Sequence, residues 1–177
     1  MVGASEFSRI VKLKQIGSVP LTIEANAEER HALARRFGIE SIGSLRAQVE
    51  LDAEGRNVSA AGHVVAAIEQ RCAVTGEPFM HEIRETLDLL FVPTRTYAAS
   101  DEDDPLEVDL DFDDADEIEY DGDRFDLGEA VAQTLALAID PYAEGPDADT
   151  FRKDMGLSDD ETPQGPLAAM LKDLSRP

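Results

Sequence analysis

Apolar and polar positions alternate in three segments of the first half of the chain, and this period of two is typical of β-strands. The segments cover about residues 45–51, 58–68 and 79–91, and each is followed by a short turn or by a proline. Consecutive strands joined by short turns that contain glycine predict an antiparallel meander.

Two stretches nearer the N-terminus are also expected to be extended. Residues 8–16 have the apolar and polar order of a strand and are a candidate fourth strand of the sheet. Residues 18–26, "SVPLTIEAN", contain Pro20, which disfavours a helical conformation at the residue before it.

The pattern changes to a helical period at residues 27–37. Asn26 is a good N-cap, Glu29 lies three residues later as in a capping box, and Gly38 is a stop signal. The expected buried stripe consists of Leu33, Ala34 and Phe37.

A second helix is expected at residues 127–139. Asp126 is its predicted N-cap, Glu129 follows three residues later, and Pro141 ends it. The apolar residues that recur at helical spacing are Leu127, Val131, Leu135 and Ala138, with Ala130, Leu137 and Ile139 beside them.

These elements predict a single α+β domain, in which an antiparallel β-meander sheet of at least four strands packs against two or three helices. We expect the sheet and first helix within 7–94, an acidic and partly disordered loop at 95–118, and a helix segment at 119–142. The remainder, 143–177, is expected to be a flexible tail with a short terminal helix near residues 167–174.

Composition narrows the class of protein. The 177 residues are 42% apolar but only 6% aromatic, with no Trp, so the core is mostly aliphatic. A single cysteine excludes an internal disulfide and fits a cytoplasmic protein. We found neither a secretory leader nor an apolar run of about 20 residues, so we expect no membrane association.

The net charge of −22 is unevenly distributed. Residues 101–126 carry 15 acidic side chains and 1 basic side chain, whereas residues 1–100 carry 13 acidic and 11 basic side chains. Such a negative overall charge repels a polyanion such as RNA. The first hundred residues are nearly neutral, however, so the charge does not exclude RNA binding by this part of the chain. The acidic segment itself suggests a basic protein partner.

The only cysteine lies in "QRCAVTGEPF", residues 70–79, which has the outline of a metal knuckle. A structural zinc site needs about four Cys or His ligands held tetrahedrally, and the chain offers one Cys and three His, of which only His81 is near Cys72 in sequence. We therefore interpret the stretch as a turn between strands, without a metal, a cofactor or a redox partner for the thiol. The residues of this turn are Cys72, Thr75, Gly76 and Pro78.

No catalytic pattern stands out. The spacing of His31, His63 and His81 matches no nucleophile and base arrangement, and "DLDFDDADEIEYDGD" lacks the central glycine of a calcium loop. Surface cations are the remaining candidates for contact with RNA or a partner, although they could equally be ordinary solvated surface. The selected candidates are Lys12, Lys14, Arg30, Arg35, Arg36, Arg71 and Arg84, from a wider set that includes Arg46 and Arg56.

Three stretches together resemble the YceD family, the large ribosomal RNA subunit accumulation proteins of bacteria and plastids. They are "VVAAIEQRCAVTGEPFMHEI", the acidic spacer that leads into "DRFDLGEAVAQTLALAIDP", and the terminal "GPLAAMLKDL". The resemblance implies a role in the production or accumulation of large-subunit (23S) ribosomal RNA. Many relatives have a second cysteine where this chain has Thr75, so the family's metal proposal is not transferred.

Three functions remain open from the sequence. The first is a non-catalytic ribosome-biogenesis factor that binds precursor rRNA, a ribosomal protein or a processing enzyme. The second is an acidic mimic that occupies the nucleic-acid site of another protein. The third is a nuclease that uses carboxylate-bound metal ions.

Overall fold

The computed structural model describes residues 5–94 and 116–156. The chain divides into two compact units, of which the first comprises the residues up to Gln70 together with Met80–Asp140. The second comprises Arg71–Phe79 and the residues from Pro141 onward. The single domain expected from the sequence stays a prediction.

The first unit is built on a five-stranded sheet in the order β2-β3-β4-β5-β6. The strands are β2 (Leu21–Glu24), β3 (Ser41–Glu54), β4 (Asn57–Arg71), β5 (Pro78–Pro93) and β6 (Asp116–Tyr120). The expected α+β class and the three long strands are confirmed. The sheet is not antiparallel throughout, however, because β6 pairs with β5 in parallel.

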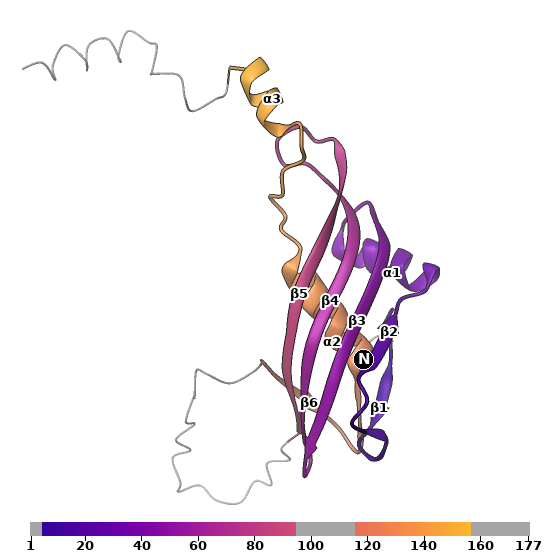
Figure 1. The fold of residues 1–177 in the computed structure, drawn as a ribbon. Helices are drawn as coiled ribbons and strands as arrows, with labels where there is room; N and C mark the ends of the chain where they lie inside the picture. The colour runs from indigo at the N-terminus through magenta and orange to yellow at the C-terminus, as the bar shows by residue number, and fades with distance from the viewer. Residues whose placement is uncertain (1–4, 95–115, 157–177) are drawn as a thin grey trace, which may run out of the picture. The chain divides into compact units, whose positions relative to one another are not determined.

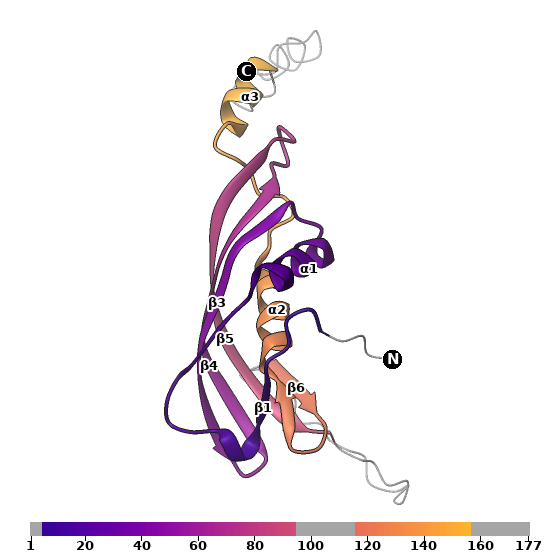
Figure 2. The same ribbon diagram turned by 90° about the vertical axis from the view of Figure 1, so that its right-hand side faces the viewer.

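Two helices cover one face of this sheet, and no helix among the described residues covers the other. Figures 1 and 2 show α1 (Ala27–Phe37) and α2 (Leu127–Ala138) on the same side of β3, β4 and β5. Alternation in sequence explains this arrangement, since every second residue of β3 and β4 is apolar and buried under the helices. The buried residues of the two strands include Leu45, Ala47, Val49, Val58, Val64, Ala66 and Ile68.

Helix α1 begins and ends where the sequence predicts. The Asn26 side chain accepts hydrogen bonds from the backbone N–H groups of Glu28 and Glu29, and the Glu29 carboxylate accepts one from the Asn26 N–H. Gly38 adopts a φ of 70°, the left-handed conformation that a glycine allows at a helix end. Leu33 is fully buried, which confirms the predicted apolar stripe.

The expected strand at residues 8–16 is wrong in both extent and partner. Only β1 (Ile10–Lys12) is extended, and a 3-10 turn, η1 (Leu13–Gln15), follows it. β1 pairs with β7 (Arg124–Asp126) in a separate two-stranded sheet. The position beside β3 is occupied by β2. Residues 21–24 of β2 pair antiparallel with residues 46–49 of β3.

Helix α2 is the most buried element of the core. Its N-cap is Asp126, as predicted, and Leu127, Val131 and Leu135 are fully buried. Leu137, which the sequence places beside this stripe, is 85% exposed. It lies two residues after Leu135, which rotates it about 200° away from the buried side.

The N-terminus of α2 is fixed to the N-terminal segment of the chain. The Leu127 N–H donates to the Arg9 carbonyl (3.0 Å), and the Asp126 carboxylate accepts the Arg9 N–H (2.8 Å). A Cβ at Gly128 would lie 2.4 Å from the Phe7 carbonyl oxygen, so only glycine permits this approach.

An ion pair joins α1 to α2. The Arg36 guanidinium donates to both carboxylate oxygens of Glu129, at 2.7 and 3.0 Å, and Ser5 donates to the same carboxylate at 2.6 Å. The bond from Arg36 is the main reason that the pKa of Glu129 is lowered from 4.5 to about 2. Burial opposes this shift but does not cancel it.

The second unit contains the turn between β4 and β5 and the helix α3 (Ala148–Asp154), which was not predicted. Arg152 of α3 pairs with Glu144 and with Asp149. Residues 116–118 of the expected acidic loop belong to β6. The remainder of that loop and the expected terminal helix at 167–174 lie outside the described residues.

We expect Glu129→Gln to lower the free energy of unfolding by about 1–2 kcal/mol at neutral pH, since a two-bond, partly buried ion pair is lost. Because the folded pKa of Glu129 lies below its unfolded value, its stabilisation is present above pH 4.5 and is lost as the pH falls toward 2. Urea unfolding across this pH range measures the effect. Glu54→Gln, an exposed carboxylate at the end of β3, is the control, and equal losses in the two variants would contradict the assignment.

Candidate functional site

The uncovered face of the sheet carries a hollow of about 540 Å³. Its centre is formed by cross-strand neighbours: Arg46 of β3 lies opposite Val65 of β4, and Gln48 lies opposite His63. Residues of β2, α1 and β5 complete the lining. The full lining is Glu24, Ala25, Arg30, Ser44, Leu45, Arg46, Gln48, His63, Val65 and Arg84.

Three arginines surround this hollow, which we call the arginine hollow. Arg30 extends from α1 and donates to the backbone carbonyls of Ala25 (2.7 Å) and Ile42 (3.2 Å), which fixes its guanidinium at the edge of β3. The Arg46 and Arg84 side chains are 61% and 73% exposed. The lining contains one carboxylate, so it is net positive although the protein as a whole is strongly negative.

The ion pairs of the two exposed arginines are weak ones. Arg46 Nε lies 3.4 Å from a Glu24 carboxylate oxygen, and Arg84 Nε lies 2.7 Å from one of Glu82. Exposed pairs of this kind contribute about 0–1 kcal/mol. Both guanidinium groups can therefore exchange these partners for a stronger anion such as a phosphate.

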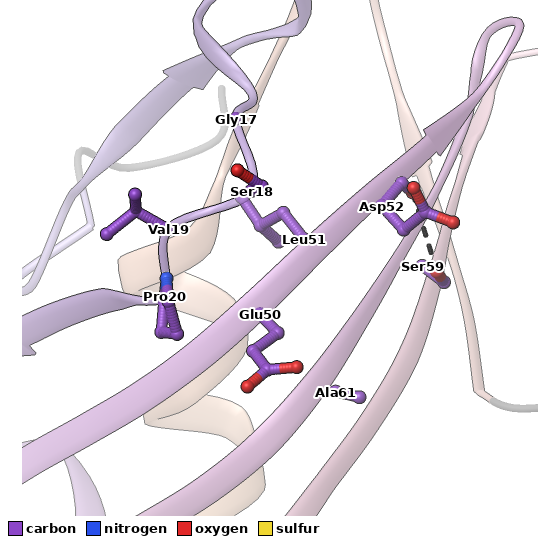
Figure 3. A pocket seen from close by; sticks show the side chains of 9 residues that line it. All are labelled: Gly17, Ser18, Val19, Pro20, Glu50, Leu51, Asp52, Ser59 and Ala61. Atoms are coloured by element: carbon purple, nitrogen blue, oxygen red, sulfur yellow. Dashed lines mark hydrogen bonds between the residues drawn. The ribbon is translucent and has the colours of Figure 1, made fainter.

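Charge reverses along the same face of β3. After Arg46 and Gln48, the next two residues on this face are Glu50 and Asp52. They line a second hollow of about 240 Å³ beside the loop Gly17–Pro20, as Figure 3 shows. An anion on this face is attracted to the arginine hollow and repelled from its acidic neighbour, which favours one position along β3.

The remaining predicted cations do not join this hollow. Lys12 lies on β1 and Lys14 on η1, where both are exposed, and Arg35 is exposed on α1. Arg36 is committed to Glu129, as described above. Arg71 belongs to the second unit, where its guanidinium donates to the Gly76 carbonyl at 3.2 Å. Contact of any of these residues with RNA stays a prediction.

The Cys72 turn is the feature of the second unit that carries chemistry. Cys72 is 3% exposed, and its Sγ accepts the backbone N–H groups of Val74 and Thr75, each at 3.4 Å. Gly76 has a φ of 72°, which closes the turn, and its N–H donates to the Cys72 carbonyl at 2.9 Å. Residues 72–76 thus form a closed turn, and the interpretation of this stretch as a turn without a metal or a redox partner stays a prediction.

Hydrogen bonds lower the pKa of the Cys72 thiol to about 7. The largest contribution comes from the Thr75 side chain, followed by the amides of Gly145 and Thr75. These donors surround the sulfur in the way that they would surround a metal-bound thiolate. Within residues 5–94 and 116–156, however, no three His, Cys, Asp or Glu side chains are grouped to hold a metal ion.

Comparison with known proteins connects this turn and the helix α2 to a family. The family model described as "Large ribosomal RNA subunit accumulation protein YceD" matches residues 60–171, more than half of the chain. The chain belongs to the YceD family. The comparisons with curated proteins and with solved structures return no match.

Membership of the YceD family gives the chain a role in ribosome biogenesis, in the accumulation of large-subunit ribosomal RNA. The matched region includes β4, β5, the Cys72 turn and α2. Among the arginines of the arginine hollow, Arg84 lies inside the match, and Arg30 and Arg46 lie before it. None of the helices described here is long and apolar enough to cross a membrane.

Several members of the hollow were not selected from the sequence, among them Gln48 and His63. Gln48 was not considered, and His63 was weighed only as a catalytic base. The sequence signal that could have identified them was the alternation of apolar and polar residues, since both occupy polar positions of adjacent strands. The register that places them opposite each other runs unbroken from the turn between Glu54 and Asn57, and the register shift between Ile42 and Ser44 lies beyond them.

We expect Cys72→Ser to shift the urea midpoint of the YceD protein by less than about 0.5 M, because the serine hydroxyl can accept the same two N–H groups. Circular dichroism during urea unfolding measures this, and metal analysis accompanies it. As a contrasting variant, deletion of Thr75 shortens the turn and should disturb the pairing of β4 with β5. Loss of a bound metal in Cys72→Ser would show that the interpretation as a turn is wrong.

Proposed function

We propose that this YceD protein supports the accumulation of large-subunit ribosomal RNA by binding RNA through the arginine hollow, without catalysing a reaction. The observation that carries the proposal is the convergence of Arg30, Arg46 and Arg84 on one hollow in the uncovered face of the sheet. We further propose that the protein acts in the cytoplasm, where ribosomes are assembled.

Guanidinium groups suit this task because they bind phosphate oxygens with two parallel hydrogen bonds and remain charged at all physiological pH values. The arginine hollow is wide enough for a phosphate group and its attached sugar. Gln48, Ser44 and His63 add neutral or titratable hydrogen-bonding groups between the cations.

The lining favours contact with the sugar–phosphate backbone over contact with the bases. Among the described residues, no Phe, Tyr or Trp lines the arginine hollow, so this lining lacks the rings on which unstacked bases stack in single-strand binding proteins. Recognition through phosphates and 2′-hydroxyls is characteristic of folded, helical RNA. A folded segment of the large-subunit RNA is therefore the ligand that we propose.

A second candidate is a basic protein partner bound by the acidic segment. Of the 38 acidic side chains in the protein, 15 lie in residues 101–126. Such a segment attracts a basic protein and can accelerate and orient its encounter. Ribosomal proteins have this character as a class, and the acidic segment could also occupy a site that otherwise binds nucleic acid.

The first test is the double substitution Arg46→Ala/Arg84→Ala. We expect it to weaken binding to a folded large-subunit rRNA transcript by about tenfold to a hundredfold at moderate salt, since two phosphate contacts are lost. The slope of log K against log salt should fall by about 0.7–0.9 for each contact. Filter binding over a range of salt concentrations measures both quantities.

Arg35→Ala is the matched control for these arginines, because Arg35 is an exposed arginine of α1 outside the arginine hollow. Equal losses in the control and in the double variant would indicate nonspecific attraction. A small-subunit rRNA transcript serves as the control ligand. Undetectable binding of the unchanged protein to any rRNA transcript at low salt would contradict the proposal.

Deletion of residues 101–115 separates the two candidates. These residues carry nine acidic and no basic side chains, so the deletion should strengthen RNA binding at the arginine hollow and leave rRNA accumulation in cells intact. Complementation of cells that lack the gene, with precursor rRNA measured by Northern blot, tests this. Loss of complementation, together with ribonuclease-resistant capture of one basic protein by the full chain, would favour the second candidate.

A further inference from the structure

A third concave surface lies in the first unit, between β6, β7 and α2. It has a volume of about 290 Å³. Its floor is apolar and rigid: the rings of Phe91 and Phe125 stack with centroids 4.1 Å apart, and both residues are buried. We call this surface the β6 groove. None of its lining residues takes part in the arginine hollow.

The β6 groove meets the edge of a strand. Three consecutive residues of β6, namely Ile118, Glu119 and Tyr120, line it. Successive side chains of a strand point to opposite faces, so a surface that contacts three in a row lies along the strand's edge. β6 pairs with β5 on one side, and no strand in the described part of the chain pairs with its other side. Its edge backbone groups can therefore pair with an added strand.

The position of Tyr120 makes this edge rigid before any partner binds. The Tyr120 hydroxyl donates to the Arg56 carbonyl at 2.5 Å, and the Tyr120 carbonyl accepts the backbone N–H of Thr94 at 2.9 Å. A strand held at its end by bonds to two other segments loses little conformational freedom when another strand pairs with it.

The negative charge beside the free edge of β6 determines which kind of partner strand can bind there. Residues 116–123 contain five acidic and no basic side chains, and Arg124 follows them. Glu119 and Asp121, both exposed, stand at the rim of the β6 groove, and the described lining contains four carboxylates and one cation, Arg124. Like charges repel a second copy of this strand, so pairing of the edge with another YceD chain is disfavoured. A strand rich in Lys and Arg is instead attracted to this edge by the same acidic side chains.

We propose that the β6 groove binds an extended segment of a protein rich in Lys and Arg, which adds to β6 as a strand. Apolar residues on one face of this segment contact the floor formed by Phe91 and Phe125, and its cationic residues lie beside Glu119 and Asp121. The site is independent of the arginine hollow, so RNA and a basic protein can be held at the same time.

The test uses the full chain and a fluorescein-labelled peptide of alternating Lys and Val, measured by fluorescence anisotropy. The double variant Glu119→Lys/Asp121→Lys should weaken binding of this peptide by about tenfold or more, since both rim charges are reversed. Glu50→Lys, which reverses an exposed carboxylate of β3, should change Kd by less than about twofold.

Two further peptides separate strand addition from general attraction. A peptide with Pro in place of every second Val keeps the charge but lacks the backbone N–H donor at each Pro. We expect it to bind at least about fivefold more weakly. A peptide with Glu in place of Lys should not bind. The proposal is overturned if the Pro peptide binds as well as the original, or if the double variant and Glu50→Lys lose affinity equally. Self-association of the unchanged chain that Glu119→Lys abolishes would overturn it as well.

Discussion

The contact between the N-terminus of α2 and the segment around Phe7 and Arg9 is the constraint on which the first unit depends. Asp126 caps α2 and at the same time accepts the Arg9 N–H, while Gly128 lets the backbone of Phe7 approach. One residue after Gly128, Glu129 binds Arg36 of α1. One helix end thus joins segments that are more than a hundred residues apart, and it positions both helices on one face of the sheet.

Placing both helices on one face determines where ligands can bind. The opposite face is left to polar side chains, and there the strand register groups Arg46, Val65, Gln48 and His63 into the arginine hollow. The same helix, α2, forms a wall of the β6 groove. A protein with a net charge of −22 therefore presents one local surface suited to an anion and another suited to a cation. Two such surfaces fit a role in bringing RNA and protein together during large-subunit assembly.

The Cys72 turn directs hydrogen-bond donors at a sulfur although the chain has a single cysteine. Its N–H groups point at the sulfur, and the pKa of the thiol is lowered to about 7, although no second cysteine follows at residue 75. The same hydrogen bonds also close a tight turn between two long strands. Their structural contribution is sufficient to explain the geometry, and the turn retains its value as a marker of the YceD family.

Local sequence was sufficient to predict the features that depend on neighbours along the chain. Capping residues gave both ends of α1 and the start of α2, and alternation gave the three long strands, because these signals act within a few residues. Which strand lies beside β3, and that β6 runs parallel to β5, depended on the tertiary structure alone. It also separated Arg30, Arg46 and Arg84 from the other cations. Pairing between distant segments depends on register and on competition for one buried face, and neither is recorded in local sequence.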